Sequence, residues 1–342
     1  MSQITLVLPF ALPVPEFAPD LVRALQAPSL AALLSRTSAR RTLPQDDAVR
    51  ALPHEQWLAR ALGLDAGGRP AFAGAAMRAY GHDPLGGTWF IVNPVHIEIA
   101  RTHLMMGDPQ ALGLPEADSR ALFDAARPYV EEAGHALLYG DAQTWFLRAD
   151  DWAELDTATP EAALGMDLTD WMPSGERAAA FRRLQNEIQI LWHTHPVNAA
   201  REARRQPAVN AFWPWAGSVP AHAAVASPLP RLAAVDTAAW LTRLAGGSPA
   251  DLAQFAAGAE GDTVLVCGSV APYALAADWG GWVAAMAQLE AVLFAPILES
   301  LKTGRVRQLR LVLSHRDALA EFTTNAMAQR KFWRRITLDA LI

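Results

Sequence analysis

The sequence predicts an α/β protein with a mostly parallel sheet flanked by helices, and two observations lead to this fold class. Short apolar runs alternate with helical patterns in the last third of the chain, where strands are expected at 232–236, 263–267 and 309–313, with helices at 237–244 and 281–303 between them. Such alternation is typical of a parallel sheet covered on both faces. Apolar residues make up 51% of the 342 residues and charged residues 19%, so the chain can bury a large core.

The first part of the chain fits the same class. The apolar run at 3–10 predicts a buried strand, and apolar residues at helical spacing between 20 and 62 predict helices. Glycine and proline are dense between 63 and 87, which indicates a connection or a domain boundary. A chain of this length accommodates one large domain with an insertion, or two domains.

The stretch from 88 to 148 has a different pattern, with strands rather than alternation. Strands are expected at 88–97 and 103–108, followed by a helix at 116–132. Two further runs, 135–139 and 144–148, have the spacing of a short hairpin. This stretch therefore reads as an α+β segment between two parts of different character.

Charge and cysteine usage exclude several classes of protein. The net charge is −6 and lysine occurs only at Lys302 and Lys331, so we expect no binding to nucleic acid or to an anionic membrane. The single cysteine, Cys267, forms no internal disulfide, and the chain has no paired Cys/His spacing for zinc. The apolar segment 6–13 lacks a basic leader and is broken by prolines, so we expect no signal peptide. We also expect no apolar run long enough to span a bilayer. We expect a cytoplasmic protein.

The segment 181–217 carries the most chemical character. Apolar residues at helical spacing predict a helix from Phe181 that Pro196 ends, because the residue before a proline is disfavoured in the helical conformation. His195 is then expected at or just past the helix end. An arginine-rich turn and a buried strand at 207–215 are expected to follow.

Polar side chains of this segment form a candidate ligand pocket. An arginine offers a planar guanidinium suited to phosphate or carboxylate, and asparagines can orient such a ligand. The alternative is that the arginines are solvated and the asparagines tie down turns. The candidate ligand-binding residues are His195, Asn198, Arg201, Asn210 and Trp213.

The stretch HPVNAAREARRQPAVNAFWPWAG, from His195 to Gly217, resembles a segment of the archaeal-type cofactor-independent phosphoglycerate mutases, members of the alkaline phosphatase superfamily. It is more similar still to the proteobacterial RpfE-type regulatory proteins, in which Asn-Glu-Ile-Gln, here residues 186–189, precedes HPVN and the final run is rich in tryptophan. The chain departs from the mutase pattern at Arg205 and Gln206, where a glycine would precede the proline.

The resemblance implies an alkaline-phosphatase-like domain formed by residues 1–85 and 151–342, with a smaller inserted α+β domain at 86–150. It also implies two divalent metal ions, Mn or Zn, held by Asp and His ligands. The chain departs from that ligand pattern: the first strand ends without an aspartate, and Thr159-Pro160-Glu161 stands where the family carries an Asp-Pro-His box. The remaining candidates for metal ligands are Asp46, Asp278 and His315.

These departures favour a degenerate phosphoglycerate-mutase-like protein with a regulatory role, which binds an anionic or phosphorylated ligand or a protein partner without metal-dependent catalysis and without a cofactor. The alternative is an active metal-dependent mutase or phosphatase with rearranged ligands, drawn from Asp46, Asp278, His195 and His315. A third hypothesis is a protein interface, including a homodimer, formed by Trp213, Trp215, Trp279 and Trp282.

Overall fold

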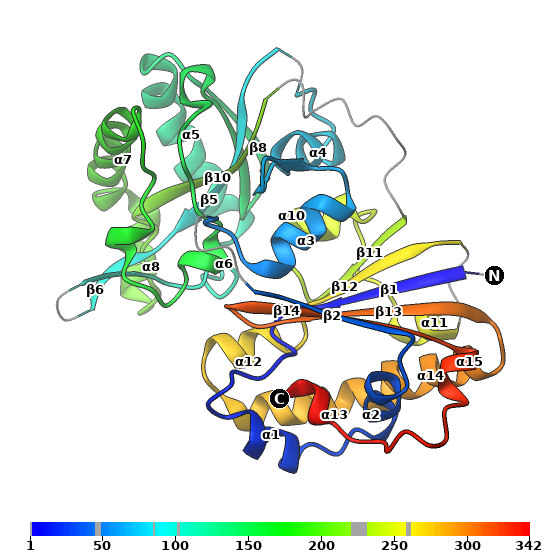
Figure 1. The fold of residues 1–342 in the computed structure, drawn as a ribbon. Helices are drawn as coiled ribbons and strands as arrows, with labels where there is room; N and C mark the ends of the chain where they lie inside the picture. Colours follow the sequence, from blue (N-terminus) through cyan, green and yellow to red (C-terminus); the bar gives the residue numbers. More distant parts are fainter. Residues whose placement is uncertain (1, 45–48, 85, 101–102, 220–230, 258–260) are drawn as a thin grey trace. The chain divides into compact units, whose positions relative to one another are not determined.

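The computed structural model describes residues 2–44, 49–84, 86–100, 103–219, 231–257 and 261–342 (Figure 1). The chain divides into two compact units. The first unit consists of Met1–Asp46 together with Pro228–Ile342, and the second unit is Asp47–Ser227.

A six-stranded sheet in the order β11-β12-β1-β13-β14-β2 forms the centre of the first unit. The four strands β11, β12, β1 and β13 are parallel, and β14 and β2 extend the sheet as antiparallel strands. Their bounds are β1 Ser2–Leu8, β2 Ala39–Pro44, β11 Arg231–Val235, β12 Thr263–Cys267, β13 Val306–Ser314 and β14 Ala318–Asn325. The predicted α/β class with a mostly parallel sheet is confirmed.

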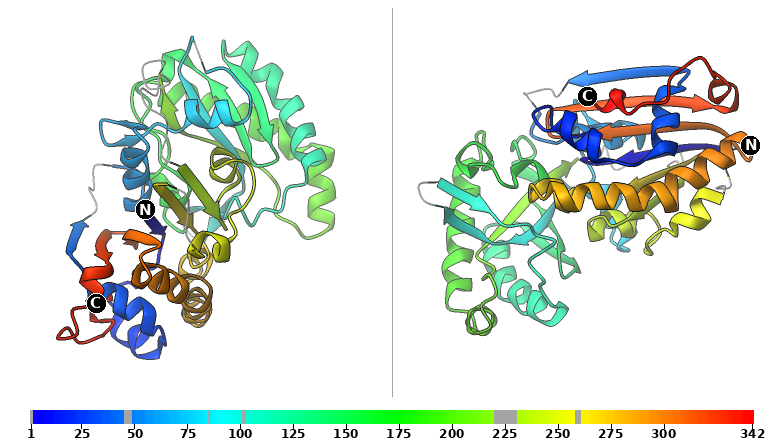
Figure 2. Two further views of the ribbon diagram at one scale, coloured as in Figure 1. Left: turned by 90° about the vertical axis from the view of Figure 1, so that its right-hand side faces the viewer. Right: turned by 90° about the horizontal axis from the view of Figure 1, so that it is seen from below.

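Alternate residues of a strand point to the same side of a sheet. A layer of helices covers the side to which the apolar residues of β1 point. Ile4, Leu6 and Leu8 of β1 contribute to one apolar core with residues from α1, α2, α11, α13 and α14 (Figures 1 and 2). The helices of this unit are α1 Ala18–Ala24, α2 Pro28–Ser35, α10 Ala239–Leu244, α11 Leu252–Ala257, α12 Ala271–Leu275, α13 Trp279–Leu289, α14 Ala295–Lys302 and α15 Ala326–Gln329.

The helix α13 continues through a π-helical turn at Glu290–Phe294 into α14. The resulting helix, Trp279–Lys302, has 24 residues and a mean hydropathy of 1.6, so by length and composition it is apolar enough to cross a membrane. The expectation that no run reaches this length was wrong. Trp282 and Met286 of this helix are fully buried in the core of the first unit. The Glu290 carboxylate accepts hydrogen bonds from the backbone of Ser29 and Leu30 at the start of α2.

The second unit contains a four-stranded antiparallel sheet in the order β10-β5-β9-β8. The predicted hairpin is confirmed as β8 and β9, and two short hairpins, β3-β4 and β6-β7, accompany the sheet. The bounds are β3 Asp65–Ala66, β4 Arg69–Pro70, β5 Trp89–Val95, β6 Ile97–Ala100, β7 His103–Met106, β8 Ala136–Asp141, β9 Thr144–Arg148 and β10 Ala211–Ser218.

Helices lie on both faces of the antiparallel sheet. Phe90 and Val92 of β5 pack into an apolar cluster with α5 and α7, and the Trp215 ring of β10 contacts Phe72, the residue before α4. The helices are α3 Pro53–Ala61, α4 Ala73–Ala79, α5 Glu116–Glu132, α6 Pro160–Ala163, α7 Ala178–His193 and α8 Pro196–Ala203. This unit is therefore α+β.

The observed division of the chain differs from the one drawn from the sequence, which placed only 86–150 in the smaller domain. The strand β10 pairs with β5, and α7 packs on the same sheet, so 47–85 and 151–227 group with 86–150. The arginine-rich turn expected after Pro196 is the helix α8 instead. A proline at the first helical position lacks only an N–H that the helix does not use, so Pro196 ends one helix and begins another.

Candidate functional site

Asn198, a candidate ligand-binding residue, is buried, and both the nitrogen and the oxygen of its side-chain amide are hydrogen-bonded to the backbone. Its Nδ2 donates to the carbonyl oxygens of Trp192 at 2.9 Å and Val209 at 2.8 Å, and its Oδ1 accepts from the Val209 N–H at 2.8 Å. The side chain thus ties the end of α7 to the segment before β10. All the hydrogen bonds expected of a buried amide are used within the fold.

Arg201 is fully buried, and its guanidinium also faces the backbone. Nε donates to the carbonyl oxygen of Pro207 at 2.8 Å, Nη2 to Leu112 at 2.7 Å and Nη1 to Gly113 at 3.4 Å. Burial lowers the pKa of Arg201, and the charge of Asp118 opposes that shift. The alternative that Arg201 is solvated is wrong. Its guanidinium donates hydrogen bonds to three backbone carbonyl groups rather than to an anion.

The remaining members of the predicted pocket have similar structural partners. The Asn210 amide exchanges two hydrogen bonds with the backbone of Ile97, at 2.8 and 2.7 Å. Trp213 is fully buried and donates to the Ala158 carbonyl at 2.7 Å. His195 caps α8, accepting at Nδ1 from the Val197 N–H. These five side chains position the backbone around α8 and β10, as the turn-stabilising alternative for the asparagines predicted.

The predicted tryptophan interface also differs from what the structure shows. Trp213, Trp215 and Trp282 are buried and pack inside their own units. The large aromatic side chains that lie on the surface of the described chain include Phe332 and Trp333, near the C-terminus.

The sequence-based metal candidates have separate roles. Asp278 is the N-cap of α13, where Oδ1 accepts from the Gly281 N–H at 2.9 Å. His315 lies in the turn between β13 and β14, and its Nδ1 accepts from the Asp317 N–H at 3.0 Å. Burial lowers the pKa of His315, against the charge of Asp317. Asp46 lies outside the described residues.

The carboxyl end of β1 is the point at which an open parallel sheet would present a ligand site. Here the strand continues into apolar, buried residues, including Phe10 and Leu12. The Phe10 carbonyl accepts from Trp282 Nε1 at 2.9 Å, and the Leu12 N–H donates to the Ser314 carbonyl at 3.0 Å. Side chains and backbone therefore fill this edge of the sheet at its central strand.

One polar pair lies farther along the same edge. The Ser269 hydroxyl, just after β12, donates to the Asp236 carboxylate, just after β11, at 2.6 Å. The Cys267 thiol is 3.3 Å from the same hydroxyl. A carboxylate beside a hydroxyl can accept its proton, so this pair is the part of the edge most suited to nucleophilic chemistry.

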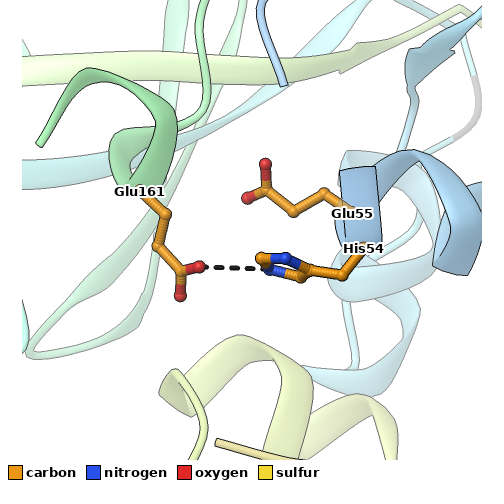
Figure 3. Close-up of side chains that lie close together, drawn as sticks. All are labelled: His54, Glu55 and Glu161. Atoms are coloured by element: carbon orange, nitrogen blue, oxygen red, sulfur yellow. Dashed lines mark hydrogen bonds and ion pairs between the residues drawn. The ribbon is translucent and has the colours of Figure 1, made fainter. Parts of the chain in front are cut away.

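Among the residues that the structure describes, His54, Glu55 and Glu161 in the second unit form a cluster that could hold a metal ion (Figure 3). One ligand atom from each residue lies within 4.8 Å of the other two. His54 and Glu55 occupy the first turn of α3, and Glu161 the first turn of α6. Both helices begin with a proline, Pro53 and Pro160, which sets where the first turn starts.

Local hydrogen bonds orient these three side chains. Glu55 Oε2 accepts from the Leu52 N–H at 2.7 Å, which is the carboxylate half of a capping box, and from the Thr159 hydroxyl at 2.6 Å. His54 Nε2 is 3.2 Å from Glu161 Oε2. Thr159 is itself the N-cap of α6, so one hydroxyl connects the starts of the two helices.

The cluster carries more negative than positive charge. Burial, followed by the charge of Glu161, raises the pKa of Glu55 to about 7, while His54, the Thr159 hydroxyl and the Leu52 N–H act in the opposite direction. Burial also raises the pKa of Asp108, with the charge of Glu161 adding to the shift. Glu161 therefore lies close enough to both Glu55 and Asp108 for its charge to raise their pKa values.

A cavity of about 170 Å³ lies beside this cluster in the second unit, and Thr159 is part of its wall. Two arginines line it. The Arg50 guanidinium donates to the carbonyl oxygens of Asp156, Asp170 and Met172. Arg69 is exposed and, within the described part of the chain, has no hydrogen-bond or ion-pair partner.

Sequence reasoning missed the cluster because Glu161 is 107 residues from His54 along the chain and each member fits an ordinary local pattern. His54 follows Pro53 inside the helical pattern expected between 20 and 62, and Glu161 stands where the mutase family carries an Asp-Pro-His box. The signal that could have found them is the repeated placement of acidic or imidazole residues directly after a helix-starting proline, at Pro53 and Pro160.

Similar folds occur among solved structures, including the following two. The PH0037 protein from Pyrococcus horikoshii is 10% identical, with a TM-score of 0.54 and coverage of 99% of this chain and 92% of that chain. At this sequence identity, the similarity shows a shared fold and nothing about function. The cofactor-independent phosphoglycerate mutase from Thermoplasma acidophilum DSM 1728 is 14% identical, with a TM-score of 0.44 and coverage of 100% and 94%. No protein-family model matches the chain, and no curated protein matches it by sequence.

Proposed function

We propose that the chain is a phosphoglycerate-mutase-like regulatory protein that acts by binding rather than by two-metal phosphoryl transfer. The observation that carries this proposal is the end of β1. Phosphoryl transfer of that kind needs carboxylate and imidazole ligands for two ions beside a hydroxyl nucleophile. Buried Phe10 and Leu12 occupy this place, and the Phe10 carbonyl is bonded to Trp282. The resemblance of the HPVN segment supports the mutase-like part of the proposal.

The ligand that we propose is a small anion, such as a phosphorylated metabolite, bound in the cavity lined by Arg69. The predicted pocket around Arg201 does not support this role, because its guanidinium bonds three carbonyl groups. Arg69 instead presents an exposed guanidinium at a cavity whose wall also contains Thr88, Thr157 and the backbone of Gly217. Guanidinium and hydroxyl donors are suited to phosphate and carboxylate oxygens.

The catalytic part of the proposal predicts no interconversion of 3-phosphoglycerate and 2-phosphoglycerate above the uncatalysed rate, with Mn²⁺ or Zn²⁺ supplied. A coupled assay on the purified full-length chain measures this. Metal-dependent turnover that disappears in Ser269→Ala would contradict the proposal and locate an active site at the Ser269–Asp236 pair instead.

The binding part predicts that Arg69→Ala weakens binding of 3-phosphoglycerate by at least about tenfold, since a charged hydrogen bond contributes about 1.5–3 kcal/mol. Isothermal titration calorimetry gives the affinity. Arg183→Ala, which removes an exposed arginine from α7, is the matched control and is expected to bind as the unmodified protein does. Equal affinities for both variants would remove the cavity from the proposal.

A further inference from the structure

His54, Glu55 and Glu161 have the spacing of a mononuclear metal site. Their ligand atoms all lie within 4.8 Å of one another, and His54 Nε2 is already 3.2 Å from Glu161 Oε2. Bonds of about 2.0–2.2 Å to a tetrahedral ion place neighbouring ligand atoms about 3.3–3.5 Å apart. Side-chain movements of about an ångström therefore bring the three atoms to the separations of such an ion.

The donor set indicates the class of metal. One imidazole nitrogen and two carboxylate oxygens suit a divalent transition ion, whereas Ca²⁺ and Mg²⁺ prefer oxygen ligands alone. Sites of this mixed kind bind Zn²⁺ more tightly than Mn²⁺ in the usual order of divalent-ion affinity. The two glutamates carry two negative charges when ionised, which a divalent ion neutralises.

The surroundings hold one ligand in place and leave one side accessible. Glu55 Oε2 is fixed by the Leu52 N–H and the Thr159 hydroxyl, so its other oxygen is available as a ligand. Hydrogen bonds of this kind orient ligands in known metal sites. The His54 side chain is 8% exposed and that of Glu161 is 29% exposed, so an ion can enter from the Glu161 side.

We propose that His54, Glu55 and Glu161 bind one Zn²⁺ ion per chain. The ion would join the first turn of α3 to the first turn of α6, and Figure 3 shows the side chains of His54, Glu55 and Glu161 from these turns lying close together. Three protein ligands leave a fourth position for water or for a ligand oxygen. The site is distinct from the two-metal arrangement that the resemblance implies, because it contains none of the candidate ligands Asp46, Asp278, His195 and His315.

Zinc binding to the chelator-treated full-length protein tests this inference. Competition with a chromophoric chelator is expected to give one tight site per chain, with Zn²⁺ bound more tightly than Mn²⁺. Loss of even an outer hydrogen-bond partner costs a metal site about 10–100-fold in affinity, so Glu161→Gln is expected to weaken Zn²⁺ binding by at least about 100-fold. His54→Gln is expected to do the same.

Glu176→Gln is the matched control, because it neutralises an exposed glutamate outside the cluster and is expected to keep the affinity unchanged. Co²⁺ supplies a readout of geometry, since a four-coordinate site gives an intense visible absorption. Absence of tight Zn²⁺ binding, or equal affinity in Glu161→Gln and Glu176→Gln, would overturn the inference. Far-UV circular dichroism checks that each variant is folded, and Glu161→Gln alone decides the result if His54→Gln does not fold.

Discussion

Replacing Arg201 by alanine is expected to destabilise the second unit by about 3–5 kcal/mol, because it leaves buried carbonyl groups without donors and opens a cavity. Arg201 is fully buried and donates to Pro207, Leu112 and Gly113. These bonds tie α8 to the segment before α5. The denaturation midpoint of the full-length chain, followed by tryptophan fluorescence and circular dichroism in urea, measures the loss.

Two further variants separate the fork geometry from the charge. Arg201→Lys keeps the charge but cannot reach three carbonyl groups in one plane, so an intermediate loss is expected. Arg204→Ala removes a neighbouring arginine of α8 whose side chain is 56% exposed and 3.6 Å from Asp118, and it is expected to cost at most about 1 kcal/mol. An Arg201→Ala protein of unchanged stability that no longer binds 3-phosphoglycerate would restore the pocket predicted from the sequence.

Replacing Glu55 by glutamine is expected to change how stability depends on pH. Burial and the charge of Glu161 raise the pKa of Glu55 from 4.5 to about 7 in the folded protein. The folded state therefore binds a proton that the unfolded state has lost between these values. The contribution of this proton to the free energy of unfolding is fully present below pH 4.5 and is lost as the pH rises through 7. The loss amounts to at most about 3 kcal/mol.

The measurement is the unfolding free energy of chelator-treated protein between pH 5 and pH 8. Relative to the unmodified chain, Glu55→Gln is expected to gain stability as the pH rises, because glutamine never ionises but keeps an oxygen that can accept from Leu52 or Thr159. The control Glu176→Gln is expected to have the same dependence of unfolding free energy on pH as the unmodified chain. If Glu55→Gln also had that same dependence, Glu55 would not ionise near neutral pH in the folded protein.

Several elements were predictable from local sequence, because their signals lie within a few residues. Apolar alternation and length identified β1, β12 and β13 and the α/β class of the first unit. The hairpin of β8 and β9 followed from its turn spacing, and the helix at 116–132 is α5 with the same bounds. The sequence left open whether the asparagines near α8 orient a ligand or tie down turns, and in the structure the amides of Asn198 and Asn210 bond the backbone.

Long-range pairing decided the rest. A buried apolar run such as 211–218 carries no mark of its partner, so only the tertiary structure showed that β10 pairs with β5 and that the second unit extends over Asp47–Ser227. The same limit applies to the sites. Arg201 had the chemistry of an anion ligand, but the carbonyl groups of residues 112 and 113 determine what it binds.

The sequence by itself determined the composition of the core, the fold class and the absence of cysteine ligands beyond Cys267, because these depend on residue types and short spacings. Only the tertiary structure brought Glu161 to His54 and Glu55 and filled the end of β1 with Phe10. Such contacts join residues about a hundred or more positions apart, and the free energy that selects them comes from packing of the whole unit rather than from local preference.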